Sequence, residues 1–175
     1  RLNFQPIINA VGYATRVSGS CPHPDIIDAV REASHRFWEV DDLLTAASTL
    51  IRESTGAEAG IVTSGASAAL ALAAAACLAG NDPDIMDRLP DTTGSARDEI
   101  IYPISGPYDY DHPIRLAGAK LVTVDYRADD AIARIERAIT PRTAAIGYVW
   151  LTLREMPDIG ALVELAHRHG LPVIV

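Results

Sequence analysis

The chain has 175 residues, of which 49% are hydrophobic and 22% are charged, and its formal net charge is -8. This length fits one domain or part of a larger one, and the hydrophobic share excludes a disordered chain. The negative charge argues against nucleic acid as a partner, because such a surface repels the phosphate backbone. Two cysteines are too few for a disulfide scaffold, and they lack the paired spacing of a zinc site. We expect neither a disulfide framework nor a bound metal.

The first part of the chain, residues 1–55, is expected to form an N-terminal arm and two helices. Residues 1–20 are polar and irregular. Pro24 stands where the first turn of a helix tolerates proline, and apolar residues follow at helical spacing as far as residue 37. A second helix is predicted from residue 41 to about residue 53, with Gly56 as its end.

From residue 56 onward, short apolar strands alternate with helices. Strands are predicted at residues 59–63, 99–104, 120–125, 143–150 and 171–175. Helices are predicted at residues 66–79, 85–89, 111–117, 129–138 and 158–169. Strands separated by helices indicate crossover connections, so we predict an α/β fold with a mostly parallel sheet and helices on both faces. The alanine-rich helix of residues 66–79 is expected to be buried.

The last predicted strand coincides with the end of the chain. In parallel sheets, ligands bind beyond the carboxyl ends of the strands, and functional residues often follow there. We therefore expect residues 56–175 to be an incomplete large domain within a longer polypeptide. The longest apolar run, residues 66–79, is shorter than the roughly 18 residues of a membrane span. A cytoplasmic protein without a membrane partner is expected.

The clearest local motif joins the strand of residues 59–63 to the alanine-rich helix. Ser64, Gly65, Ala66 and Ser67 are small, so their backbone amides can approach an anion closely. The beginning of the helix adds unpaired N–H groups and a favourable dipole, and the two hydroxyls can add hydrogen bonds. The motif thus predicts a phosphate-binding corner, although it is neither a Walker motif nor a dinucleotide fingerprint. The alternative is ordinary helix capping by Ser64.

A second cluster follows the next predicted strand. Tyr108, Tyr110 and His112 lie in a loop at the ligand edge of the sheet, where a flat heteroaromatic cofactor would need a stacking group. A loop packed by its own tyrosines is the alternative. Lys120, the single lysine of the chain, begins a predicted strand at the opposite edge. We expect an exposed side chain there, because a Schiff-base lysine needs a desolvated pocket.

Three stretches together resemble the pyridoxal-phosphate (PLP) enzymes of fold type I, in the branch of selenocysteine synthase and D-glucosaminate-6-phosphate ammonia-lyase. They cover almost the whole chain and include residues 8–12, 15–16 and 18–20, residues 55–59 and 62–66, and residues 110–112 and 117–122. The second stretch is the most specific. The resemblance implies that residues 1–175 belong to the N-terminal part of a PLP-binding large domain.

For the cofactor, the resemblance implies that residues 64–67 bind the phosphate. It also implies that one of Tyr108, Tyr110 and His112 stacks on the pyridine ring, without deciding which. It places no catalytic residue in this chain, because the aspartate paired with the pyridine nitrogen and the Schiff-base lysine would both follow residue 175. The segment alone is therefore expected to be inactive.

For the substrate, the resemblance implies a segment that lines the entrance, often across a dimer interface. The residues it assigns are Asn9, Thr15, Arg16 and Ser20. Arg16 would bind an anionic group of a small amino substrate. A homo-oligomer, either a dimer or a larger assembly, is expected for the complete protein.

The implied activity is that of a PLP-dependent lyase of the ammonia-lyase type. Its substrate would be an amino-sugar acid or a hydroxy amino acid, which would lose its α-proton and then eliminate its β-substituent. One alternative is an L-seryl-tRNA(Sec) selenium transferase, against which the negative charge argues. Another alternative is a non-catalytic domain that binds a phosphometabolite or serves assembly.

Overall fold

Two units make up the chain in this computed structural model, which describes residues 3–103, 110–150 and 156–175. Unit 1 is Arg1–Val62 and unit 2 is Thr63–Val175. None of the helices in the described ranges is long and apolar enough to cross a membrane.

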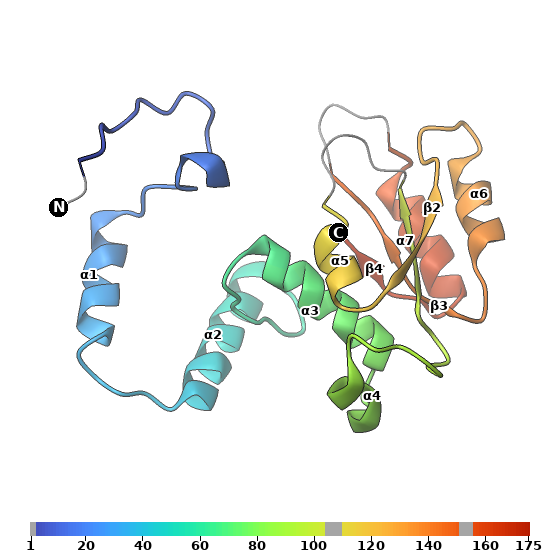
Figure 1. The fold of residues 1–175 in the computed structure, drawn as a ribbon, viewed down its shortest axis with the longest axis horizontal. Helices are drawn as coiled ribbons and strands as arrows, with labels where there is room; N and C mark the ends of the chain where they lie inside the picture. Colours follow the sequence, from blue (N-terminus) through green and yellow to red (C-terminus); the bar gives the residue numbers. More distant parts are fainter. Residues whose placement is uncertain (1–2, 104–109, 151–155) are drawn as a thin grey trace. The chain divides into compact units, whose positions relative to one another are not determined.

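Unit 1 contains a short 3-10 turn and two helices (Figure 1). The turn is η1 (Thr15–Val17), and the helices are α1 (Pro24–Ala33) and α2 (Val40–Thr55). Helix α1 begins with proline in its first turn, as predicted. Gly56 ends α2 with a left-handed φ of 76°, and its amide donates to the Arg52 carbonyl, so the predicted end is confirmed. Neither helix contains a buried residue, so the unit has no helical core of its own.

Unit 2 is built on four parallel strands (Figure 1). They are β1 (Glu99–Pro103), β2 (Lys120–Val124), β3 (Thr143–Gly147) and β4 (Val173–Ile174), in the order β2-β1-β3-β4. Every pair is parallel. The predicted α/β class with a mostly parallel sheet is therefore confirmed.

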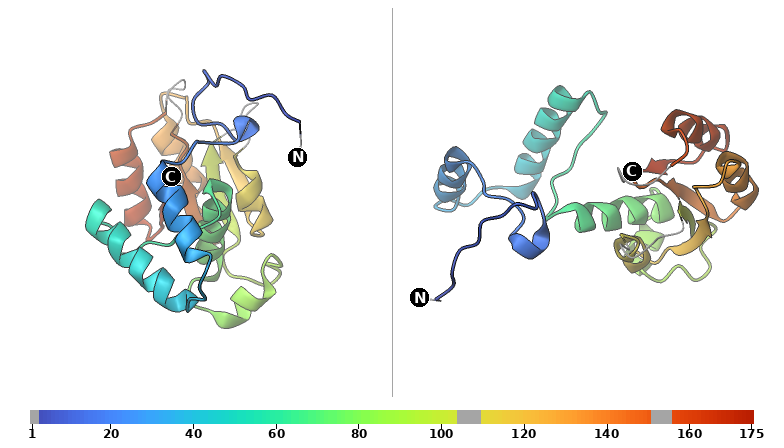
Figure 2. Two further views of the ribbon diagram at one scale, coloured as in Figure 1. Left: turned by 90° about the vertical axis from the view of Figure 1, so that its left-hand side faces the viewer. Right: turned by 90° about the horizontal axis from the view of Figure 1, so that it is seen from above.

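In its described ranges unit 2 has five helices, of which the first two precede the first strand and the last three each connect one strand to the next. They are α3 (Ala66–Ala79), α4 (Pro83–Arg88), α5 (His112–Leu116), α6 (Ala131–Ala138) and α7 (Ile159–Arg168). Neighbouring residues of β1 point to opposite faces: Ile100 packs in one core with α3 and α5, and Ile101 packs in another with α6 and α7. In Figure 2 helix α3, in green, accordingly lies across the sheet from α6 and α7, in orange and red.

Three local predictions are wrong. Residues 59–63 form no strand, because they pair with no strand of the described sheet and the side chains of Ile61 and Val62 are exposed. Strand β3 ends at Gly147 instead of residue 150. Helix α3 has the predicted bounds but is buried only in its second half.

Candidate functional site

A groove of about 620 Å³ opens at the carboxyl ends of β1, β3 and β4, beside the beginning of α3. Its walls include Ala66 of α3, Tyr102 of β1, Trp150 after β3 and Val175 after β4. This is the edge where parallel sheets bind ligands, and the volume lies in the usual range of about 300–1,000 Å³ for small-molecule sites. The groove therefore defines the candidate binding site of unit 2.

The small-residue corner of residues 64–67 reaches this wall through Ala66. Gly65 is the N-cap of α3 and has φ 148°, a backbone conformation that residues other than glycine rarely adopt. Its carbonyl accepts from the Thr63 hydroxyl at 2.9 Å and from the Ala69 amide at 3.0 Å. The first-turn amides from Ala66 onward have no acceptor within the helix, and among the described residues no side chain caps this helix end. Capping by Ser64 is therefore not how this helix begins.

The predicted stacking residues have different places. Tyr110 lines the groove with 54% of its surface exposed. His112 begins α5, and its Nδ1 lies 3.3 Å from Oδ1 of Asp111, but it is not part of the described groove wall. Tyr108 lies outside the described residues. Tyr110 and Ala66 therefore line the same groove. His112 is close to Tyr110 in the sequence but is not among the groove residues.

Asp111 anchors the segment that carries Tyr110. Its side chain is buried, and the Arg115 Nε donates to its Oδ2 at 2.8 Å. Burial alone would raise the pKa of Asp111, but the hydrogen bonds and charges of Arg115 and His112 hold that pKa below its ordinary value. The carboxylate therefore stays ionised. Through Arg115 it ties the residue that follows Tyr110 to helix α5.

Tyr102 is a groove residue that the sequence did not reveal. It is only 4% exposed, and its ring lies so close to Gly147 of the neighbouring strand that a Cβ there would collide with it. Burial, together with the negative charge of Asp111, raises the pKa of Tyr102 to about 12. The phenol therefore stays protonated and can act as a hydrogen-bond donor. Its position close to the carboxyl end of a predicted strand was the available signal.

The residues assigned to the substrate entrance all lie in unit 1. The Asn9 side chain closes a turn, because its Nδ2 donates to the Gly12 carbonyl at 2.8 Å and its Oδ1 accepts from the Val11 amide. Arg16 and Ser20 are exposed, and Thr15 begins η1. The structure thus places these four residues in one segment of unit 1, whereas the groove is lined by residues of unit 2.

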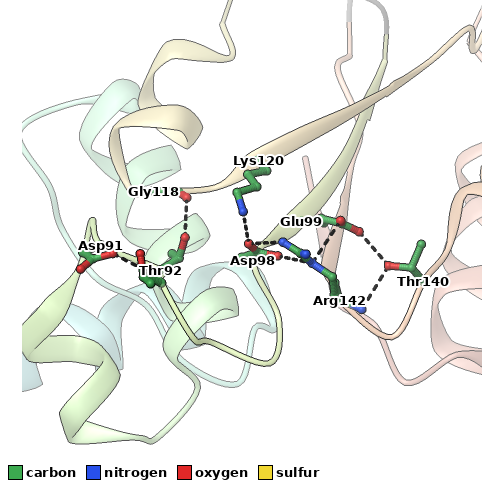
Figure 3. A network of polar contacts seen from close by, with 9 residues as sticks. Asp91, Thr92, Asp98, Glu99, Gly118, Lys120, Thr140 and Arg142 are labelled. Carbon is green, nitrogen blue, oxygen red and sulfur yellow. Dashed lines mark hydrogen bonds and ion pairs between the residues drawn. The ribbon is translucent and has the colours of Figure 1, made fainter.

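Lys120 lies at the opposite edge of the sheet in a polar network (Figure 3). Its Nζ is 2.7 Å from Oδ2 of Asp98, which is only 2% exposed. Arg142 Nε donates to Oδ1 of the same carboxylate at 2.9 Å and also approaches Glu99. The network joins the amino ends of β1, β2 and β3. Lys120 is an exposed residue at a strand end, as predicted, but its role as a partner of Asp98 was missed.

We expect Asp98→Asn to destabilise the protein by about 2 kcal/mol at pH 7, because it removes the charge from buried hydrogen bonds. The hydrogen bonds from Arg142 hold the pKa of Asp98 below its ordinary value of 3.8, against the effect of burial. A lowered folded-state pKa stabilises the fold above the unfolded pKa, and this contribution is lost as the pH falls through the folded pKa. The stability gap between wild type and variant, measured by urea unfolding, should therefore narrow from pH 6 to pH 3.

Lys120→Gln provides the matched control, since Arg142 still holds both oxygens of Asp98 in that variant. We expect a smaller loss of stability than for Asp98→Asn. A gap that stays constant between pH 6 and pH 3 would show that the ionised carboxylate does not stabilise the sheet.

The chain is similar to a protein family and to two characterised relatives. The sequence profile of the DegT/DnrJ/EryC1/StrS aminotransferase family matches residues 23–175. D-glucosaminate-6-phosphate ammonia lyase of Salmonella typhimurium is 32% identical over 182 residues, which cover 100% of this chain and 49% of the relative. The 5'-C-glycyluridine monooxygenase-decarboxylase of a Streptomyces species is 31% identical over 183 residues, which cover 99% of this chain and 46% of the relative.

A solved structure is also similar. The structure of D-glucosaminate-6-phosphate ammonia-lyase superposes with a TM-score of 0.89 and 31% sequence identity, over 97% of this chain and 48% of that chain. The chain thus spans about half the length of the curated relatives it matches.

Proposed function

The chain belongs to the DegT/DnrJ/EryC1/StrS aminotransferase family, and from this membership we propose that it binds pyridoxal 5'-phosphate in the groove of unit 2. The proposal includes the assignment of residues 56–175 to a PLP-binding large domain and of residues 1–55 to an arm with helices. The complete protein would be a homo-oligomeric lyase.

The observation that carries the proposal is the beginning of α3. The amides of Ala66 and Ser67 have no acceptor within the helix and no side-chain cap from the part of the chain that the structure describes, and the positive end of the helix dipole faces the same point. The space where a Cβ of Gly65 would stand is open. A phosphate bound here would accept from these amides and from the hydroxyls of Ser64 and Ser67.

The rest of the groove suits the pyridine ring. Its walls are mostly apolar and aromatic, and Tyr110 offers an exposed ring for stacking. Tyr108 and His112 remain alternatives for that role. Tyr102 adds one protonated phenol, which can donate to an oxygen or nitrogen of the bound molecule. These residues hold and orient the cofactor.

When bound, the cofactor would supply an electron sink that acidifies the Cα–H bond of an amino substrate. In our proposal the chain's own residues bind and position the cofactor and the substrate. Arg16 would hold an anionic group of the substrate, and Asn9, Thr15 and Ser20 would line the entrance. Lys120 is paired with Asp98 at the other sheet edge, so the Schiff-base lysine would come from outside residues 1–175.

The reaction that we propose is removal of the α-proton followed by β-elimination, on an amino-sugar acid or a hydroxy amino acid. Support comes from the similarity to the ammonia lyase of Salmonella typhimurium. The second candidate is a decarboxylation coupled to oxygen, because the Streptomyces monooxygenase-decarboxylase is nearly as similar. Selenium transfer to seryl-tRNA would require RNA binding, against which the net charge of -8 argues.

The proposal is tested on the full-length protein with added PLP. We expect a visible absorbance band that borohydride abolishes, and ammonia release from an amino-sugar acid such as D-glucosaminate-6-phosphate. Oxygen uptake with release of carbon dioxide would favour the second candidate. A tRNA gel shift at low salt would favour the transferase, and the absence of any band would favour a non-catalytic binding domain.

A further inference from the structure

Trp150 is an exposed aromatic residue on the wall of the groove. It follows the end of β3 at Gly147 and lines the groove with 66% of its surface exposed. Tyr102 and Tyr148 on the same wall are buried. When a ligand covers an exposed indole at the edge of an apolar groove, apolar surface is removed from water, and this lowers the free energy of the complex.

The ring of Trp150 contacts the ring of Tyr148. Their ring centroids lie 6.2 Å apart with an angle of 55° between the planes, a tilted contact within the usual distance range of aromatic pairs. Tyr148 is itself fixed, because its hydroxyl donates to the Pro157 carbonyl at 3.3 Å. Trp150 therefore rests on a fixed ring and presents its remaining surface to the groove.

The same groove connects Trp150 with Ala66 at the beginning of α3. A molecule whose phosphate is held at that corner extends into the space that Trp150 borders. We propose that Trp150 packs against the pyridine ring of bound PLP and so contributes to cofactor binding. This inference rests on the proposed function, and it assigns the ring contact to a residue of another loop than Tyr108, Tyr110 and His112.

The test uses tryptophan fluorescence of the full-length protein during titration with PLP. We expect the emission assigned to Trp150, taken as the difference between wild type and Trp150→Phe, to be quenched as PLP binds. Trp38→Phe is the matched control, because Trp38 lies in unit 1, where its Nε1 donates to the Ala33 carbonyl. That variant should retain the quenching.

Affinity gives a second readout. Trp150→Ala should weaken PLP binding by roughly 3- to 10-fold, the loss expected for one aromatic contact. Trp150→Phe should stay within about 2-fold of wild type, since it keeps an aromatic surface. This rescue separates a ligand contact from a merely structural role.

The outcomes distinguish this inference from the proposed function. If the absorbance band forms, but the quenching is unchanged in Trp150→Phe and Trp150→Ala binds as tightly as wild type, the role of Trp150 is overturned and PLP binding stands. If no band forms in the wild-type protein, both proposals fall. If Trp150→Ala does not fold, the fluorescence of Trp150→Phe alone decides.

Discussion

Ser67→Asp should weaken PLP binding by roughly 1,000-fold while leaving the fold at least as stable as wild type. A carboxylate in the first turn of α3 would face the proposed phosphate, and two unit charges about 4 Å apart repel by about 4 kcal/mol at an effective dielectric constant of 20. The same carboxylate interacts favourably with the helix dipole, which raises stability by about 0.3–1 kcal/mol. Affinity and stability should therefore change in opposite directions. Spectroscopic PLP titration and thermal unfolding measure the two effects.

Ser67→Ala is the control for this experiment. It removes one hydroxyl but introduces no charge, so the loss of affinity should be only about 3- to 10-fold. If Ser67→Asp bound PLP as tightly as wild type, the phosphate would have to lie elsewhere in the groove. The comparison thus separates a charge effect at the corner from a general loss of side-chain contacts.

Gly118→Ala should destabilise unit 2 by about 3 kcal/mol and lower the Tm by roughly 10 °C. Gly118 connects α5 to β2 with φ 101°, and a Cβ there would collide with the Pro90 carbonyl group. The backbone cannot retreat easily, since the Gly118 carbonyl accepts from the Thr92 hydroxyl at 3.4 Å and its amide donates to the Arg115 carbonyl at 2.9 Å (Figure 3). Left-handed strain and steric overlap therefore add to each other.

Gly170→Ala separates these two causes. Gly170 also has a positive φ, 64°, but nothing lies within 4 Å of the place where its Cβ would stand. We expect a loss of about 1 kcal/mol, from backbone strain alone. Equal losses in the two variants would mean that the contact with Pro90 does not restrict Gly118.

Local sequence patterns predicted much of the fold. Helix α3 has the bounds expected from its run of small residues and from Gly80, and Gly56 ends α2 as predicted. These signals act over a few residues, so they can be read from the chain. The strand expected at residues 59–63 failed, because a strand forms only where another strand offers hydrogen bonds, and that partner is not encoded locally.

The candidate site was predicted in part. Ala66 and Tyr110 line one groove at the edge where parallel sheets bind ligands, whereas the binding roles of residues 64–67 and Tyr110 stay predictions. Tyr102 was missed, since its sequence surroundings are typical of a buried strand, whereas Trp150 stands at the end of a predicted strand, where ligands of parallel sheets are expected. The pairing of Asp98 with Arg142 joins residues 44 positions apart, and only the register of the sheet brings them together. Long-range contacts of this kind leave no pattern in a single sequence.

The central claim is that the beginning of α3 holds the phosphate of PLP. A crystal structure of the full-length protein with PLP tests it most directly. Our account predicts phosphate oxygens within hydrogen-bonding distance of the backbone nitrogens of Ala66 and Ser67, and the ring in the groove beside Trp150. A structure with the phosphate bound elsewhere, or with these amides bonded to protein groups, would contradict it.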